Sequence, residues 1–311
     1  MRNLSMDALC EKIGNAVSKQ AISKYEKGES LPGSQILILL SQALDVKPDY
    51  FFRESQFAIS NIEFRKKAKM GVKEVEAIKE EIRDHIERYL EIEDVWGCVP
   101  SFANPVKEML VASEDDVYEV VKKLKDAWNI GEDGILSVTD LLESKNIKVV
   151  EIKADSSFDG LSGYVNNDEN MPFVVVNKSF DVERLRFTGL HELGHLVMNL
   201  PDEMEKKDKE RLCHLFASEM LISRDTFVDV LGERRSDISL QELKVLQAVY
   251  GISVDALMFK AKTVGVISES KHTSFCIRKN KSLAFKDAVE RSSYRGVEES
   301  SRFDRLVYRA L

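Results

Sequence analysis

One pentapeptide constrains the fold of this 311-residue chain more than any other feature. It contains His191, Glu192 and His195, and it lies in a segment, 181–199, whose apolar residues recur every three or four positions. That period predicts a helix, and histidines four residues apart on one face can bind the same metal ion. The glutamate between them can hold a water molecule at the metal. The helix is predicted to be packed into a core, rather than solvated, by Leu190, Leu193, Leu196 and Val197.

A third metal ligand has to come from another segment. A catalytic zinc ion takes three protein ligands and keeps one position open for water. The next predicted helix, 208–220, offers Glu210 and His214, which are four residues apart and so share a face. Glu219 lies far enough round that helix to point elsewhere. The spacing alone leaves open whether Glu210 or His214 is the third ligand.

The pattern around these two helices is mixed. Helices precede a group of β-branched runs, and further helices follow them. This order predicts an α+β domain with a small sheet. The expected helices are 117–128, 134–143, 181–199, 208–220, 240–250 and 253–262, and the expected strands are 147–152, 160–165 and 173–176.

The first fifty residues read as short helices separated by tight turns. Ser5 and Ser18 can cap helices that stop at Gly14 and Gly28, and two further apolar helices, 35–44 and 49–52, would close a small all-α core. The second helix starts with residue types that contact base edges and phosphates in DNA-binding proteins. On residue types alone we favour an ordinary solvated face. The outward residues are Lys19, Gln20, Ser23 and Lys24.

Two segments flank the central region. Residues 61–95 are a charged helical stretch with one apolar stripe, which predicts packing against a neighbouring domain, with self-association as the alternative. The last forty residues look irregular and basic, with a final helix at 301–310, and we interpret them as a solvated or partner-binding extension. The apolar stripe of residues 61–95 comprises Val72, Val75, Ile78, Ile82, Ile86 and Leu90. From these patterns we divide the chain into four units, 1–54, 55–110, 111–270 and 271–311.

Charge bears on the class of partner. The net charge of −8 argues against a nucleic-acid binder, but residues 1–54 are neutral, 271–311 carry +5 and the remainder carries −13. The neutral charge of residues 1–54 predicts a modest, salt-sensitive affinity for DNA, which dimerisation would strengthen. No apolar run approaches the ~18–20 residues of a membrane span, no leader is evident, and the four cysteines form no CxxC pair. We therefore expect a cytoplasmic protein without a membrane partner.

The N-terminal segment resembles a known family. "VSKQAISKYEKGESLP", followed by "LSQALDVKPDYFF", is similar to the Xre/lambda-repressor-like helix-turn-helix family. The resemblance implies a lambda-repressor-like domain that binds operator DNA through Lys19, Gln20, Ser23 and Lys24, usually as a homodimer. The family has a further basic helix ahead of the position of Leu4, so we expect the first helix here to be short or missing.

The central segment resembles a second family. "ERLRFTGLHELGHLVMNL", followed by "ERLCHLFASEMLIS", is similar to the ImmA/IrrE family of zinc metallopeptidases, with its pattern RFTxxHExxH and then ExxxNxFAxxLLMP. The resemblance covers roughly residues 115–265 and implies a zincin-like fold. It implies that Zn²⁺ is held by His191, His195 and Glu210, with Glu192 as the general base. His214 replaces the family's asparagine, and Ile222-Ser223 replaces its Met-Pro.

The two resemblances together imply a multidomain regulator. We expect a DNA-binding protein whose zinc endopeptidase domain cleaves a repressor or another regulatory protein. The alternative is a non-proteolytic regulator or antitoxin whose zincin fold serves as an interaction or sensing module. Peptide hydrolysis would also need a donor for the oxyanion, for which His214 and Tyr164 are candidates.

Overall fold

The computed structural model describes residues 4–52, 72–97, 101–165, 168 and 170–310, with side chains of the first long helix from residue 75. Part of the predicted helical stretch, residues 61–71, and the side chain of Val72 lie outside the described residues. Along the part that is described, no helix combines the length and the apolar character that a membrane span requires.

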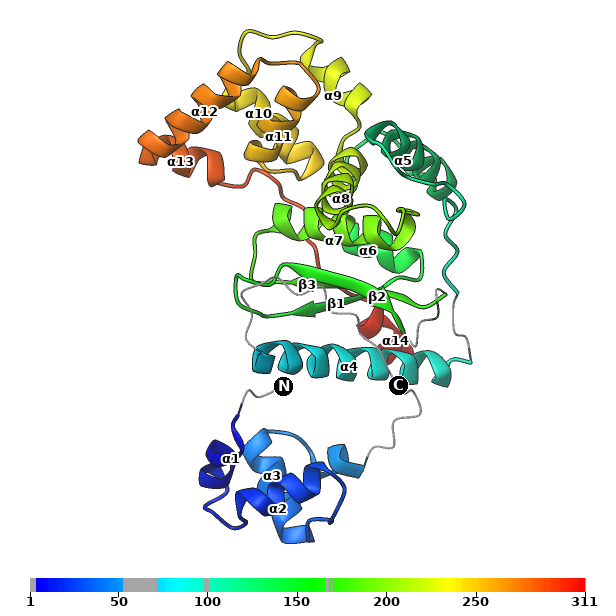
Figure 1. The fold of residues 1–311 in the computed structure, drawn as a ribbon, viewed down its shortest axis with the longest axis vertical. Helices are drawn as coiled ribbons and strands as arrows, with labels where there is room; N and C mark the ends of the chain where they lie inside the picture. The colour runs from blue at the N-terminus through cyan, green and yellow to red at the C-terminus, as the bar shows by residue number, and fades with distance from the viewer. Residues whose placement is uncertain (1–3, 53–71, 98–100, 166–167, 169, 311) are drawn as a thin grey trace.

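The N-terminal unit is a small helical bundle (Figure 1). It contains α1 (Met6–Lys12), α2 (Lys19–Glu26), α3 (Ser34–Leu44) and a 3₁₀ turn, η1 (Pro48–Phe52). Ser5 and Ser18 cap α1 and α2 as the sequence predicts, and each hydroxyl accepts a hydrogen bond from the third residue beyond it. Gly14 and Gly28 follow these helices with φ near +66° and +69°, a left-handed conformation that glycine adopts at little cost. The core residues are Leu9, Cys10, Ile13, Ile22, Leu40 and Ala43.

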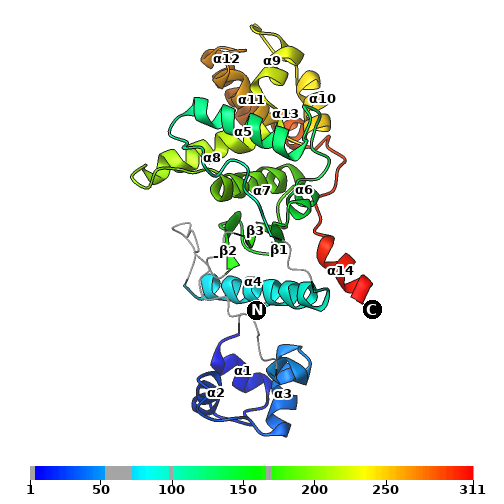
Figure 2. The same ribbon diagram turned by 90° about the vertical axis from the view of Figure 1, so that its right-hand side faces the viewer.

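A three-stranded sheet organises the central unit. The strands are β1 (Lys148–Ile152), β2 (Gly160–Tyr164) and β3 (Pro172–Asn177), in the spatial order β1-β3-β2. β1 runs parallel to β3, and β2 runs antiparallel to it. Helix α4 (Val72–Val95) covers one face, and α6 (Val138–Ser144) and α7 (Val182–Val197) cover the other (Figures 1 and 2).

The side chains of the sheet divide between these two layers. Because side chains alternate along a strand, Val150 and Val175 lie in the cluster under α4, while Val149 and Val174 lie in the cluster under α7. The predicted stripe on α4 faces the sheet, so this helix packs against the neighbouring unit as its spacing predicts. The buried stripe residues are Val75, Ile78, Ile82, Ile86 and Leu90. The unit boundaries at residues 54, 110 and 270 stay predictions.

Further helices cover α7 and extend the unit. Each expected helix is present, with ends that differ by up to four residues. They are α5 (Glu114–Trp128), α8 (Lys206–Leu221), α9 (Arg224–Leu231), α10 (Leu240–Tyr250) and α11 (Val254–Thr263), then α12 (Glu269–Lys281), α13 (Leu283–Glu290) and α14 (Arg302–Ala310).

The expectation of an irregular C-terminal stretch before the last helix is wrong. Residues 269–290 form α12 and α13, which are capped by Ser268 and Ser282. Their periodic signal is weak because α12 buries no side chain fully and α13 buries only Val289. The sequence pattern also misses helix α9, which has two buried side chains, Phe227 and Leu231.

The segment after α13, residues 291–301, returns to the sheet unit and is called the clasp here. Its Glu298 pairs with Arg186 of α7, and neither side chain is more than 2% exposed. The same carboxylate accepts hydrogen bonds from the backbone N–H groups of Val138 (3.0 Å) and Thr139 (2.8 Å), at the start of α6. Glu298 thus neutralises the buried Arg186 and also accepts hydrogen bonds from the N–H groups at the N-terminus of α6.

Arg186 receives further partners from three parts of the chain. Its guanidinium donates to the carbonyl oxygens of Ile135 (2.6 Å) and Tyr250 (3.2 Å) and to the hydroxyl of Tyr294 (2.7 Å). Gly251 comes within contact of this side chain, since a Cβ there would lie 2.4 Å from Arg186 Nε. These hydrogen bonds therefore connect the first half of α7 to the segment before α6, to the end of α10 and to the clasp.

Beyond the clasp, α14 lies against α4 (Figure 2). Its Arg302 lies 3.3 Å from Glu93 of α4, which in turn lies 3.1 Å from the buried Lys148 of β1. Burial lowers the pKa of Lys148, and the carboxylate of Glu93 opposes that effect. The apolar stripe of α4 therefore ends in a buried group of charges.

We predict that replacing Glu298 by Ala lowers the free energy of unfolding of the sheet unit by about 3–5 kcal/mol, because it leaves the Arg186 cation buried without its counter-charge. Urea denaturation followed by the fluorescence of Trp128, which is buried in the same core, measures this. Glu299→Ala, at the exposed neighbouring position, is the matched control. Equal decreases for the two variants would contradict the role given to the pair.

Candidate metal centre

Helix α7 presents the histidines at the centre of the sheet unit. Asp181 caps it by accepting a hydrogen bond from the N–H of Arg184 at 2.9 Å. Leu190 and Leu193 are fully buried, as the apolar period predicts. Gly194 allows α8 to pack closely, since a Cβ there would lie 3.1 Å from the ring of Phe216. This close packing brings the N-terminal half of α8 over the two histidines.

Three side chains converge between α7 and α8. The Nε2 atoms of His191 and His195 lie 3.2 Å apart, and Glu210 Oε2 lies 3.2 Å from the first and 3.7 Å from the second. At bond lengths of about 2.0–2.1 Å, the ligands of a tetrahedral zinc ion lie about 3.3 Å from one another. Among the residues that the structure describes, this is the one group of three metal-binding side chains. The separations therefore fit a zinc ion.

The electrostatics agree with a cation at this point. Two imidazole nitrogens that face each other at 3.2 Å repel unless a proton or a metal ion lies between their lone pairs. Hydrogen bonds from His191 and His195 hold the pKa of the Glu210 carboxyl well below its usual range. Glu210 therefore stays ionised, which is the form that binds a metal.

The structure separates the two alternatives for the third ligand. His214 donates from Nδ1 to the backbone carbonyl of Glu210 at 2.6 Å, and its ring meets that of His191 edge to face, with the centroids 4.4 Å apart. It lies beside the converging group without being one of the three atoms that meet. The geometry favours Glu210, in line with the family pattern.

Glu192 and two neighbours complete the site. Its side chain is 7% exposed and accepts a hydrogen bond from the hydroxyl of Ser162 on β2 at 2.8 Å. Tyr164, a candidate oxyanion donor, donates its hydroxyl proton to the Leu196 carbonyl at 2.8 Å. The spacing argument assigns no role to Ser162, because an interaction between a strand and a helix thirty residues apart leaves no local pattern.

Cys213 of α8 also touches the centre. Its buried sulfur lies 3.2 Å from Nδ1 of His195, on the side of the ring away from Nε2. A partner at this nitrogen fixes the ring orientation of a histidine that binds metal through the other one.

A cavity opens beside the histidines. It has a volume of about 580 Å³ and lies between the segment 101–108 and the end of β2. His195 forms part of its wall, so a chain lying in this cavity would reach the metal position. Other lining residues are Phe102, Asn104, Lys107, Tyr164 and Asn170.

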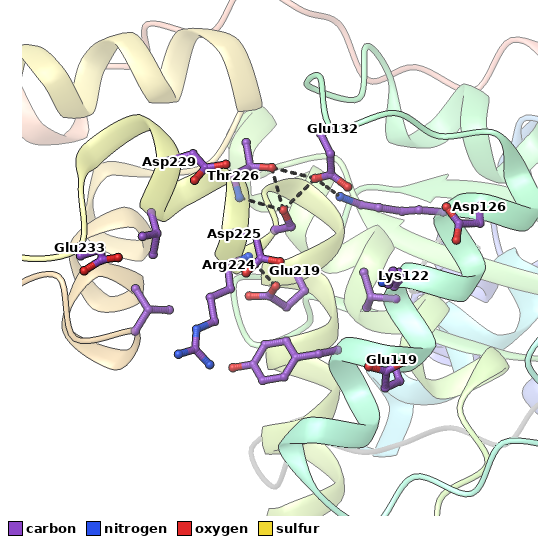
Figure 3. Close-up of a pocket in the computed structure, with 16 residues that line it drawn as sticks. Glu119, Lys122, Asp126, Glu132, Glu219, Arg224, Asp225, Thr226, Asp229 and Glu233 are labelled. Atoms are coloured by element: carbon purple, nitrogen blue, oxygen red, sulfur yellow. Dashed lines mark hydrogen bonds and ion pairs between the residues drawn. The ribbon is translucent and has the colours of Figure 1, made fainter.

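Glu219 points away from the metal centre, as the helical spacing predicts. It lines a separate cavity of about 800 Å³ between α5, α8 and α9 (Figure 3). It forms an ion pair with the buried Lys260 of α11. It also accepts a hydrogen bond from the N–H of Arg224 at 2.7 Å (Figure 3). On the wall of the same cavity, Glu132 accepts from Ser223 at 2.7 Å. Lys260 neutralises Glu219, and Lys125 lies 3.2 Å from Glu132.

The predicted DNA-contacting residues lie on α2. Lys19, Gln20 and Lys24 are exposed, while Ser23 is half-buried. Lys19 forms an exposed ion pair with Asp7 of α1 at 2.7 Å, of a kind that contributes little to stability and can be exchanged for a phosphate. Helix α2 thus offers two lysines and a glutamine to a partner on one surface.

We predict that the protein gains stability on adding zinc, by about 2.7 kcal/mol at a free zinc concentration 100-fold above the Kd. His191→Ala and Glu210→Ala should abolish this gain, because each removes one converging atom. The difference between the urea midpoints of unfolding with and without zinc measures this gain in stability. His272→Ala, in α12, is the control. His214→Ala should keep the gain; its disappearance there would make His214 the third ligand.

Comparisons with known proteins find a matching family for each of the two parts of the chain. Residues 1–51 match the helix-turn-helix family, and residues 142–262 match the family described as IrrE N-terminal-like domain. Over 53 residues the chain is 45% identical to the "Uncharacterized HTH-type transcriptional regulator y4aM" of Sinorhizobium fredii (strain NBRC 101917 / NGR234). That alignment covers 17% of this chain and 36% of the relative, so the chain spans about a third of the relative's length.

These matches confirm the predicted pair of families and the predicted fold class, an all-α unit followed by a mixed unit with a small sheet. The chain therefore combines an N-terminal helix-turn-helix domain with an IrrE N-terminal-like, peptidase-type domain.

Proposed function

We propose that the chain is a DNA-binding regulator whose second domain is a zinc-dependent endopeptidase that cleaves a repressor or another regulatory protein. The observation that carries this is the convergence of His191, His195 and Glu210 at tetrahedral spacing, with Glu192 next to His191 on the same helix. A cytoplasmic location is part of the proposal, since operator DNA and a repressor are found there.

Each residue has a separate task in the proposed hydrolysis. His191, His195 and Glu210 would hold the zinc ion. A bound zinc ion supplies Lewis acidity, which polarises a peptide carbonyl and makes water more acidic. Glu192 accepts the proton of the attacking water and later gives it to the leaving amine. The cavity beside His195 offers room for the peptide on one side of the bond that is cut.

The first domain would bring this activity to DNA. Exposed Lys19 and Lys24 can bind phosphates, and Gln20 can bind a base edge in the major groove. Ser23 is half-buried, which suits a hydrogen bond to a phosphate from the helix surface. A homodimer would double these interactions and offset the neutral charge of the domain.

We predict that Lys19→Ala with Lys24→Ala weakens binding to DNA selected from a random pool by the wild-type protein. The slope of log K against log salt should become shallower by about 0.9 for each phosphate that the variant no longer neutralises. Fluorescence anisotropy at several salt concentrations measures it. Lys123→Ala, at an exposed position of α5, is the control and should change neither the affinity nor the slope. An unchanged slope in the double variant would place the DNA-binding surface elsewhere.

We predict that Glu192→Gln binds zinc as the wild type does but cleaves its substrate at least about 100-fold more slowly, because the amide cannot accept the proton. The test incubates each variant with the purified protein products of the neighbouring genes and follows their cleavage by gel electrophoresis and mass spectrometry. Glu203→Gln, at an exposed position in the loop before α8, is the matched control.

Two outcomes would overturn the proposal. Unchanged cleavage by Glu192→Gln would remove Glu192 from the reaction. Stoichiometric zinc and tight operator binding without cleavage by the wild type would support the alternative, a non-proteolytic regulator or antitoxin whose second domain binds a partner or senses a signal.

A further inference from the structure

The Glu192 carboxylate accepts a hydrogen bond from a serine of the sheet. Ser162 Oγ lies 2.8 Å from Glu192 Oε2, and an ionised carboxylate can only accept, so the hydroxyl is the donor. Among the residues that the structure describes, no other side chain or backbone N–H donates to this carboxylate. Since Glu192 is 7% exposed, little solvent is available to replace that donor.

The approach of β2 to α7 makes this hydrogen bond possible. β2 is an edge strand that pairs only with β3, and its residues 160 and 162 share the face toward α7. A Cβ on Gly160 would lie 2.6 Å from the side chain of Thr188 and 2.6 Å from the Val175 carbonyl oxygen. Only a glycine lets the strand lie this close to the helix, and that closeness puts the Ser162 hydroxyl within reach of Glu192.

We propose that Ser162 is a positioning residue for Glu192, an inference that rests on the proposed endopeptidase function. The serine donates to Oε2 and fixes the plane of the carboxylate, which leaves Oε1 without a donor from the described residues and able to take a proton. A carboxylate without this donor would be free to rotate, and the position of the oxygen that accepts the proton would no longer be fixed.

This role differs from a general contribution to stability. Ser162 is not among the three side chains that converge on the metal position. Its removal should therefore leave zinc affinity and KM within about twofold of the wild type. The effect should fall on kcat, which we expect to drop by about 10–100-fold, the range found for groups that orient residues in metal sites.

Kinetics of the zinc-loaded full-length chain test this inference. Ser162→Ala should lower kcat as stated, while Ser162→Thr, which keeps a hydroxyl at the same position, should restore most of it. Ser179→Ala, at an exposed position after β3, is the matched control. Adding Ser162→Ala to Glu192→Gln should produce no further decrease, because the serine acts only through Glu192. An additive decrease, or wild-type kcat in Ser162→Ala, would overturn the inference.

A second readout does not depend on cleavage. Crystal structures of the metal-free wild type and of Ser162→Ala should show the Glu192 carboxylate in different orientations, with the rest of α7 unchanged. An unchanged carboxylate would overturn the inference. If the wild type cleaves nothing, the proposed function fails, and this comparison still decides whether Ser162 positions Glu192.

Discussion

A guanidinium removed from solvent needs a counter-charge and hydrogen-bond acceptors, and Arg186 sets this requirement at the centre of the peptidase-type domain. It lies five residues before His191 on the same helix. The carbonyls of Ile135 and Tyr250 and the carboxylate of Glu298 accept hydrogen bonds from its two terminal nitrogens and come from three separate segments. Each partner satisfies the arginine only in one placement of α7. The burial of a single charge therefore fixes the helix that carries the candidate metal ligands.

A second group of buried charges sets the placement of α4. Apolar packing along its stripe resists rotation of the helix but opposes sliding only weakly, since one isoleucine can replace another. Glu93 ends the stripe between Lys148 and Arg302, and a displacement of one helical turn would bury it without either cation. The two sides of the sheet thus share one principle, in which apolar residues supply most of the stabilisation and a buried ion pair selects one arrangement.

Local pattern predicts much of this molecule, and its failures have physical causes. The capped α1 and α2 and the long α7 and α8 have periodic signals, and β1 and β3 have β-branched ones, whereas β2 is rich in glycine. The spacing of His191, Glu192 and His195 indicates the helix that carries the candidate metal ligands. The spacing leaves Glu210 and His214 equivalent, because both face α7. What distinguishes the two side chains is a hydrogen bond from His214 to the Glu210 carbonyl, which turns the His214 ring toward the backbone of α8. Partners joined over long sequence separations, such as Ser162 with Glu192 or Arg186 with Glu298, leave no periodic trace.

The position of the clasp has a practical meaning for fragments of this protein. The region matched as IrrE N-terminal-like domain, 142–262, contains the three candidate metal ligands and the whole sheet. It contains neither α4 nor Glu298. A protein expressed from those residues alone would expose the apolar face that includes Val150, Leu161 and Val175, and it would bury an uncompensated arginine. Such a fragment should aggregate, and the smallest stable piece begins before α4 and extends through α14.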